Sequence, residues 1–168
     1  MLFGRMRPGG RPQRPLRYEA MQLRDIMTSG VVTAGLEDDV LHVAQLMRDH
    51  GVGSVILCDP QGDPVAMVTD RDLAVRVMAE SRPVSEPVRT HASRPLITGE
   101  PDMDLEEAAA RMVQHRIRRL PVLGPRGLSG IVTLDDIAVR TGNLEVAQRM
   151  THDVIEGALP EFFFHERG

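Results

Sequence analysis

The residues best suited to ligand chemistry are a threonine and an aspartate that occur together twice. Thr69 and Asp72 lie in the stretch VAMVTDRDLA, and Thr133 and Asp136 lie in SGIVTLDDIA, 64 residues later. In both copies an apolar run precedes the threonine, which predicts a strand that ends where a helix begins. A carboxylate at such a junction can accept both hydroxyl groups of a ribose, as acidic residues do in dinucleotide-binding folds. The same spacing also fits a helix-capping box, with aspartate in place of the usual glutamate or glutamine.

A repeat of this length indicates a duplicated half-domain, because solenoid units are shorter. In each half a short β-branched run, 30–33 or 95–98, precedes an amphipathic helix, a two-stranded hairpin and a final helix that starts at the Thr-x-x-Asp. We therefore predict an α/β (α+β) fold of two β-α-β-β-α repeats. A half of about 55 residues is too small to bury its own sheet, so the repeats should pack sheet to sheet about a pseudo-twofold axis, with two equivalent clefts between them.

The first helix of each half is predicted from its apolar periodicity. Each carries apolar residues at i, i+3, i+4 and i+7 and ends at a histidine, His50 or His115. The apolar positions are Val40, Val43, Ala44 and Met47 in the first half and Leu105, Ala108, Ala109 and Met112 in the second.

The flanking segments differ in composition from the repeats. An arm rich in arginine, proline and glycine (1–20) is predicted to be disordered. The expected order is then a first repeat (21–80), a linker (81–88), a second repeat (89–141) and a C-terminal helix with a phenylalanine-rich tail (142–168). Phe162, Phe163 and Phe164 of this tail are expected to dock on the protein or across a dimer, because an exposed cluster would promote aggregation.

Phosphate donors are available in the second half only. Arg118 and Arg119 stand at the start of its hairpin, where the first half has Gly53 and Ser54. Successive side chains of a strand alternate between faces, so at least one of the two arginines should face a cleft. The other interpretation is a solvated charged edge that discourages aggregation.

Composition argues against several classes of protein. The net charge of −4 gives no general attraction to nucleic acid, and no apolar run approaches the about 20 residues of a membrane span. The six histidines show no metal-binding spacing, and no serine lies in a nucleophile motif, so we expect neither catalysis nor a metal site. Cys58, within an apolar run, is expected to be an inert thiol. The N-terminus lacks the apolar core of a secretory signal, which favours the cytoplasm.

The two repeats resemble the cystathionine-β-synthase (CBS) domain family across about residues 21–141. The resemblance is carried by LRDIMTSGVVT, HGVGSVILCDPQGDPVAMVTDRDLA and HRIRRLPVLGPRGLSGIVTLDDIA and by their spacing. It implies a tandem pair of motifs, a Bateman module of the stand-alone prokaryotic type, acting as a regulatory sensor without catalytic activity. The ligands it implies contain adenosine: AMP, ADP, ATP, NAD or S-adenosylmethionine. The opening of the second repeat, VRTHASRPLIT, lacks the Asp-Ile-Met that opens the first.

The resemblance also implies which residues hold ligand, with each site built across the two motifs. No cofactor is required, and the adenine nucleotide would be a regulatory ligand. One implied site has Thr133 and Asp136 on the ribose, with Val32, Val52, Gly53 and Ser54 around the adenine. The other has Thr69 and Asp72 on the ribose, with Ile97, Ile117, Arg118 and Arg119 around the base and phosphates. Because Asp70 and Asp135 crowd the two helix starts, we expect AMP or ADP to be preferred over ATP.

The sequence also predicts how the chain assembles and offers two alternative functions. We expect a homodimer, both from the resemblance and because Leu41, Leu46, Met103 and Met112 exceed what one small core would hold. A regulated target, if the module controls one, would be a separate protein. The alternatives are a regulatory protein that contacts nucleic acid through its arginine-rich arm, whose binding would depend steeply on salt, and, less favoured, an enzyme acting on a nucleotide.

Overall fold

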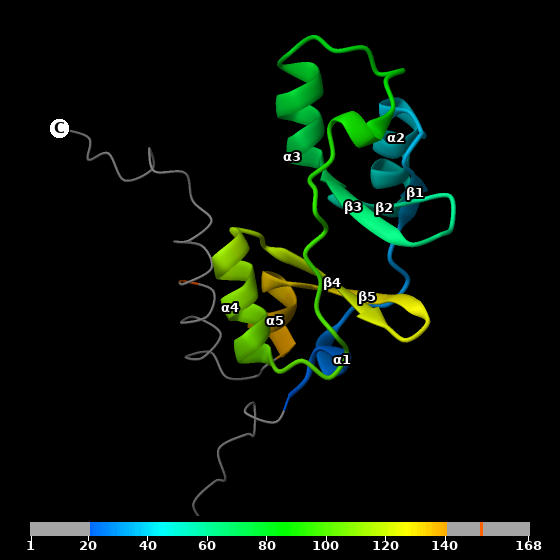
Figure 1. Ribbon diagram of the computed structural model, residues 1–168. Coiled ribbons are helices and arrows are strands. Elements are labelled where there is room, and N and C mark those ends of the chain that lie inside the picture. Colours follow the sequence, from blue (N-terminus) through cyan, green and yellow to red (C-terminus); the bar gives the residue numbers. More distant parts are fainter. Residues whose placement is uncertain (1–20, 141–151, 153–168) are drawn as a thin grey trace, which may run out of the picture.

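The computed structural model describes residues 21–140 and residue 152 (Figure 1), so the expected arm lies outside the described residues, as does the C-terminal tail apart from His152. The first half contains β1 (Thr33–Gly35), α2 (Val40–His50), β2 (Ser54–Cys58), β3 (Pro64–Thr69), α3 (Asp70–Asp72) and the π-helical stretch η2 (Leu73–Met78) that continues α3. The second contains α4 (Leu105–His115), β4 (Arg119–Gly124), β5 (Gly127–Thr133) and α5 (Leu134–Arg140). Two short helical segments, α1 (Leu23–Ile26) and η3 (Val88–Thr90), precede the halves.

Each half is built on a small sheet. In the first, β1 pairs parallel to β2 and β2 pairs antiparallel to β3. In the second, β4 and β5 form an antiparallel hairpin whose register pairs Arg119 with Thr133, as Ser54 pairs with Thr69 in the first. The mixed α/β class and the repeated hairpin agree with the sequence prediction.

The opening strands are shorter than predicted. The first begins at Thr33 instead of residue 30, and the run 95–98 is not a strand. Only Gly99 makes the corresponding contact, a parallel bridge to Val122.

The helices α2 and α4 form where the periodicity placed them. Both begin after an aspartate cap: Asp39 Oδ1 accepts from His42 N, and Asp104 Oδ1 accepts from Glu107 N, at 2.7 Å each. Both end at the expected histidines, and the residue that follows, Gly51 or Arg116, adopts the left-handed conformation. The predicted apolar positions are buried, except that Ala44 is half-buried.

The short helix α1 packs against the second half, although it precedes the first half in the sequence. Figure 1 shows α1 beside β5, and not among the elements of the first half. Leu23 and Ile26 are fully buried in the hydrophobic cluster that contains Leu105, Met112 and Leu120. The backbone of Thr28 exchanges two hydrogen bonds with Ile131, of 2.9 and 3.0 Å.

The segment that opens the second half makes the reciprocal exchange. Val88 is buried in the cluster of the first half with Val43 and Val55. Ser93 exchanges two backbone hydrogen bonds with Met67, of 2.9 and 3.4 Å. Each repeat therefore completes the core of the other, which ties the two halves into one unit.

Candidate functional site

Both copies of the Thr-x-x-Asp form a capping box at the start of the final helix. The Oδ2 atom of Asp72 accepts hydrogen bonds from Thr69 N at 2.9 Å and from Thr69 Oγ1 at 2.8 Å. Asp136 Oδ2 accepts from Thr133 N and Oγ1, each at 2.8 Å. The threonine oxygens in turn accept from the backbone N–H of the aspartates, at 3.2 Å in both copies. The structural role weighed for the motif is therefore confirmed.

The capping box leaves part of the Asp72 carboxylate for other donors. A carboxylate oxygen has two lone pairs, and Oδ2 already accepts two hydrogen bonds. The Oδ1 atom lies 3.4 Å from Arg76 Nη2, which is longer than a typical charge-assisted hydrogen bond. A ribose hydroxyl would therefore meet Asp72 through Oδ1, next to Arg76. The cap and a ligand-binding role can coexist.

Other residues of the two implied sites lie at the start of each hairpin and beside the two cores. Ser54 is opposite Thr69 and Arg119 is opposite Thr133, each at the first pair of its hairpin. Ile97 and Ile117 pack against the second core, and Val32 packs against the first. Eleven of the twelve implied residues are half-buried, namely Val32, Val52, Gly53, Ser54, Thr69, Asp72, Ile97, Ile117, Arg119, Thr133 and Asp136, whereas Arg118 is exposed.

Arg119 crosses from the second repeat to the first. A Cβ atom placed on Gly53 would lie 3.1 Å from Arg119 Nη2 and 3.2 Å from Asp70 Oδ2. The Asp70 N–H also donates to the Gly53 carbonyl, at 3.2 Å. A guanidinium from one repeat and a carboxylate from the other thus approach a position that has no side chain, immediately next to Thr69. Arg119 is half-buried and reaches toward the first repeat, whereas Arg118 is exposed.

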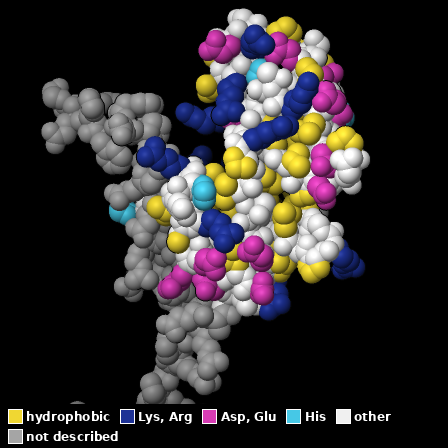
Figure 2. All heavy atoms as spheres, viewed as in Figure 1, with side chains coloured by type: hydrophobic (Ala, Val, Ile, Leu, Met, Phe, Trp, Pro, Cys, Tyr) yellow, Lys and Arg dark blue, Asp and Glu magenta, His cyan; other side chains and the backbone are white. Residues whose placement is uncertain are grey.

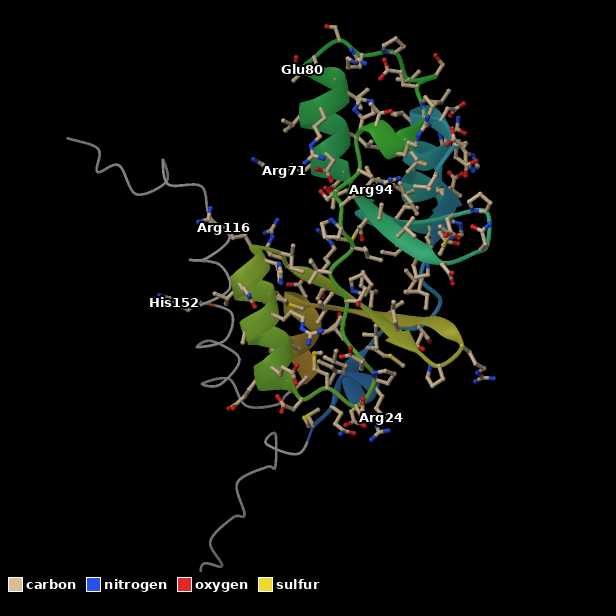
Figure 3. The ribbon with its side chains drawn as sticks, in the orientation of Figure 1. Arg24, Arg71, Glu80, Arg94, Arg116 and His152 are labelled. Carbon is tan, nitrogen blue, oxygen red and sulfur yellow. The ribbon has the colours of Figure 1, made fainter. Side chains whose placement is uncertain are left out.

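Arginines gather at the junction of the two halves. Figure 2 shows several dark-blue side chains on the first half near this junction, and Figure 3 shows Arg71 of the first half and Arg116 of the second projecting on the same side of it. In the part of the chain that the structure describes, Arg71, Arg116 and Arg118 form no ion pair with a carboxylate, whereas Arg48, Arg82, Arg89 and Arg111 each do. The guanidinium groups of Arg71, Arg116 and Arg118 are therefore not held by a carboxylate of the described residues within ion-pair distance.

Other reactive groups offer little chemistry. Cys58 is half-buried, and burial, followed by the negative charges of Asp59 and Asp63, raises the pKa of its thiol. A raised pKa keeps the thiol protonated and weakly nucleophilic. Among residues 21–140 and 152, no cluster of three potential metal ligands occurs and no helix is long and apolar enough to cross a membrane.

The sequence analysis missed two polar residues near the Thr69/Asp72 site. Arg76 contacts Asp72, and His91 is buried, with 4% of its surface exposed, at the position that corresponds to Ile26. The four-residue spacing of Asp72 and Arg76 is a usual signal for a helical ion pair and could have indicated the first. Local sequence gives no signal for the burial of His91, because its core partners come from the other repeat.

The fold and its doubled motif define a pair of CBS domains, and comparison with known proteins agrees. The family model described as "CBS domain" matches residues 23–79 and 88–140. The chain is 40% identical over 125 residues to the CBS domain-containing protein YhcV of Bacillus subtilis, covering 74% of this chain and 89% of YhcV. The protein therefore belongs to the CBS domain family.

Solved structures share the same fold. The CBS domain protein PAE2072 from Pyrobaculum aerophilum, complexed with AMP, matches with a TM-score of 0.68 and 22% identity, covering 77% of this chain and 99% of that one. The CBS domain pair of protein MJ0100, in complex with 5'-methylthioadenosine and S-adenosyl-L-methionine, matches with a TM-score of 0.66 and 24% identity, covering 73% and 97%. At these identities the similarity establishes the fold.

Proposed function

We propose that this protein is a regulatory sensor that binds adenine nucleotides between its two CBS motifs and has no catalytic activity of its own. The observation that carries the proposal is the doubled Thr-x-x-Asp beside a junction lined with arginine. Two solved CBS structures that bind AMP, or S-adenosylmethionine and 5'-methylthioadenosine, support the choice of an adenosine-containing ligand. Aliphatic side chains such as Val32 and Ile97 would hold the purine by dispersion, because aromatic residues are absent from residues 21–140.

The two sites are proposed to differ in how they treat phosphate. Arg119 would bind the phosphate of the ligand whose ribose is held by Thr69 and Asp72. Asp70, on the other side of Gly53, would repel additional negative charge. This site should therefore favour AMP or ADP over both adenosine and ATP. The first hairpin has Gly53 and Ser54 at the positions that match Arg118 and Arg119, so it supplies no arginine to the Thr133/Asp136 site, and this site should discriminate less.

Replacing Arg119 with alanine tests this assignment. The loss of a charge-assisted bond to phosphate is expected to weaken AMP binding at one of the two sites by about 1.5–3 kcal/mol, or roughly tenfold to hundredfold. Adenosine binding should change little. Calorimetric titration of AMP and adenosine, at low and high salt, measures both the preference and its salt dependence.

The neighbouring arginine supplies the matched control. Arg118→Ala removes the same charge from an exposed side chain, so it should reduce AMP binding much less than Arg119→Ala does. Equal AMP and adenosine affinities in the wild type, or an unchanged preference in Arg119→Ala, would refute the phosphate assignment.

We also propose that two copies of the chain associate. Met103 and Met112 are core residues, so they do not support the expected dimer. Leu41 is 48% exposed, and three other large apolar side chains are also exposed, namely Val75, Met78 and Val84. These exposed apolar side chains are candidates for contact with a second copy of the chain. Light scattering at micromolar concentration should give twice the chain mass of 18.6 kDa, and a monomer mass would refute the dimer. The regulated partner would be a separate protein.

A further inference from the structure

We propose that Arg76 is a positioning residue for the Thr69/Asp72 site and that it couples occupancy of this site to the segment 82–93, which joins the two repeats. The inference rests on the proposed function, because it assumes that Asp72 meets a ribose. It adds a route by which ligand binding would change another part of the molecule.

The guanidinium of Arg76 has two partners from different parts of the fold. Its Nη2 atom lies 3.4 Å from Asp72 Oδ1, one turn earlier in the same helix. Its Nη1 atom donates to the backbone carbonyl of His91 at 2.8 Å. The shorter contact is to the joining segment. Arg76 therefore links the carboxylate proposed to hold ribose to a backbone group that is 15 residues away in the sequence.

The His91 end of this link is held firmly. The His91 side chain is 5% exposed, and its Nε2 lies 2.9 Å from Glu86 Oε2. Glu86 Oε1 lies 2.9 Å from Arg82 Nη2. The backbone that precedes His91 is also fixed to the first repeat, because Val40 N donates to the Glu86 carbonyl at 3.1 Å and Val88 N donates to the Asp38 carbonyl at 2.8 Å. A shift of Arg76 would thus act on an ordered network.

Ligand binding should redistribute the two contacts of Arg76. Hydroxyl groups that donate to Asp72 Oδ1 satisfy its remaining lone pairs, which weakens the attraction between this carboxylate and Arg76. The guanidinium can then bond more fully to the His91 carbonyl. We therefore expect ligand binding to make the segment 82–93 more resistant to local opening.

Hydrogen–deuterium exchange of this segment tests the coupling, with AMP as the probe and calorimetry in parallel. In the wild type, saturating AMP should slow exchange in 82–93 by about fivefold or more, the lower end of typical coupling between sites. Arg76→Met keeps the long side chain but removes both polar contacts, so the AMP-induced slowing should disappear and AMP affinity at this site should fall several-fold. Arg76→Lys offers a single compact ammonium that cannot serve both partners as the planar guanidinium does, so it should retain more affinity than methionine while losing the slowing.

Arg89, an arginine within the segment 82–93, is the control. Arg89→Gln breaks the exposed pair with Glu37 but lies outside the Asp72 network, so the AMP-induced slowing should remain. Bound AMP without slowing in the wild type, or slowing that persists in Arg76→Met, would overturn the coupling and leave the proposed function intact. Failure of the wild type to bind AMP or any other adenosine ligand would overturn both. The wild-type exchange measurement can refute the coupling without any variant, so the proposal stays testable even if Arg76→Met does not fold.

Discussion

The variant Asp136→Ala is expected to bind AMP at one of its two sites about tenfold to hundredfold more weakly than the wild type while remaining folded. The expected loss corresponds to about 1.5–3 kcal/mol, the range for hydrogen bonds to a charged group. The same substitution removes the carboxylate half of the capping box, which accepts from Thr133 N and Oγ1 at the start of α5, and this should cost about 1 kcal/mol of folding free energy. Calorimetric titration measures the first effect and thermal unfolding measures the second.

The adjacent acid separates these two effects from a general change in charge. Asp135 is exposed in the same first turn of α5, so Asp135→Ala removes an equal charge without removing the cap or the proposed ribose acceptor. It should bind AMP at least as tightly as the wild type. If Asp136→Ala unfolds at a lower temperature yet binds AMP as tightly as the wild type, the motif is only a helix cap.

The variant Leu23→Ala is expected to lose about 2–5 kcal/mol of unfolding free energy, the usual cost of a large-to-small change in a well-packed core. Leu23 is fully buried beside Leu105 and Leu120 of the second half. Denaturant unfolding measures the loss, and hydrogen exchange should show that β5 and α5 open more readily than β2 and β3.

Leu41→Ala is the matched control, because Leu41 is 48% exposed and its truncation should change stability by less than about 0.5 kcal/mol. A loss below about 1 kcal/mol for Leu23→Ala, or destabilisation confined to the first half, would contradict the exchange of opening segments between the repeats.

Much of this architecture could be predicted from the sequence because local patterns determine it. The spacing of Val40, Val43 and Met47 produces one buried face on α2, and the same spacing in the second half produces α4. The doubled Thr-x-x-Asp marked both strand-to-helix junctions, and its capping geometry followed from the side-chain types alone.

The contacts between repeats could not be predicted in the same way. A short segment such as Leu23–Ile26 carries apolar residues, but its pattern does not say which of two similar cores receives them. The approach of Arg119 to Gly53 likewise depends on how the repeats pack, since strand alternation showed only that Arg118 and Arg119 diverge. The contact between Arg76 and the His91 carbonyl required the fold, because the two residues meet only after the segment 82–93 docks.

Thermal unfolding of the wild-type protein with and without adenosine ligands tests the central proposal most directly. AMP, ADP, ATP, NAD and S-adenosylmethionine would each be added in excess. A ligand present at 100 times its dissociation constant should stabilise the folded state by about 2.7 kcal/mol, and the proposal predicts such a rise in melting temperature for AMP. If none of the five ligands raises the melting temperature, the proposal that this CBS pair senses adenine nucleotides is contradicted.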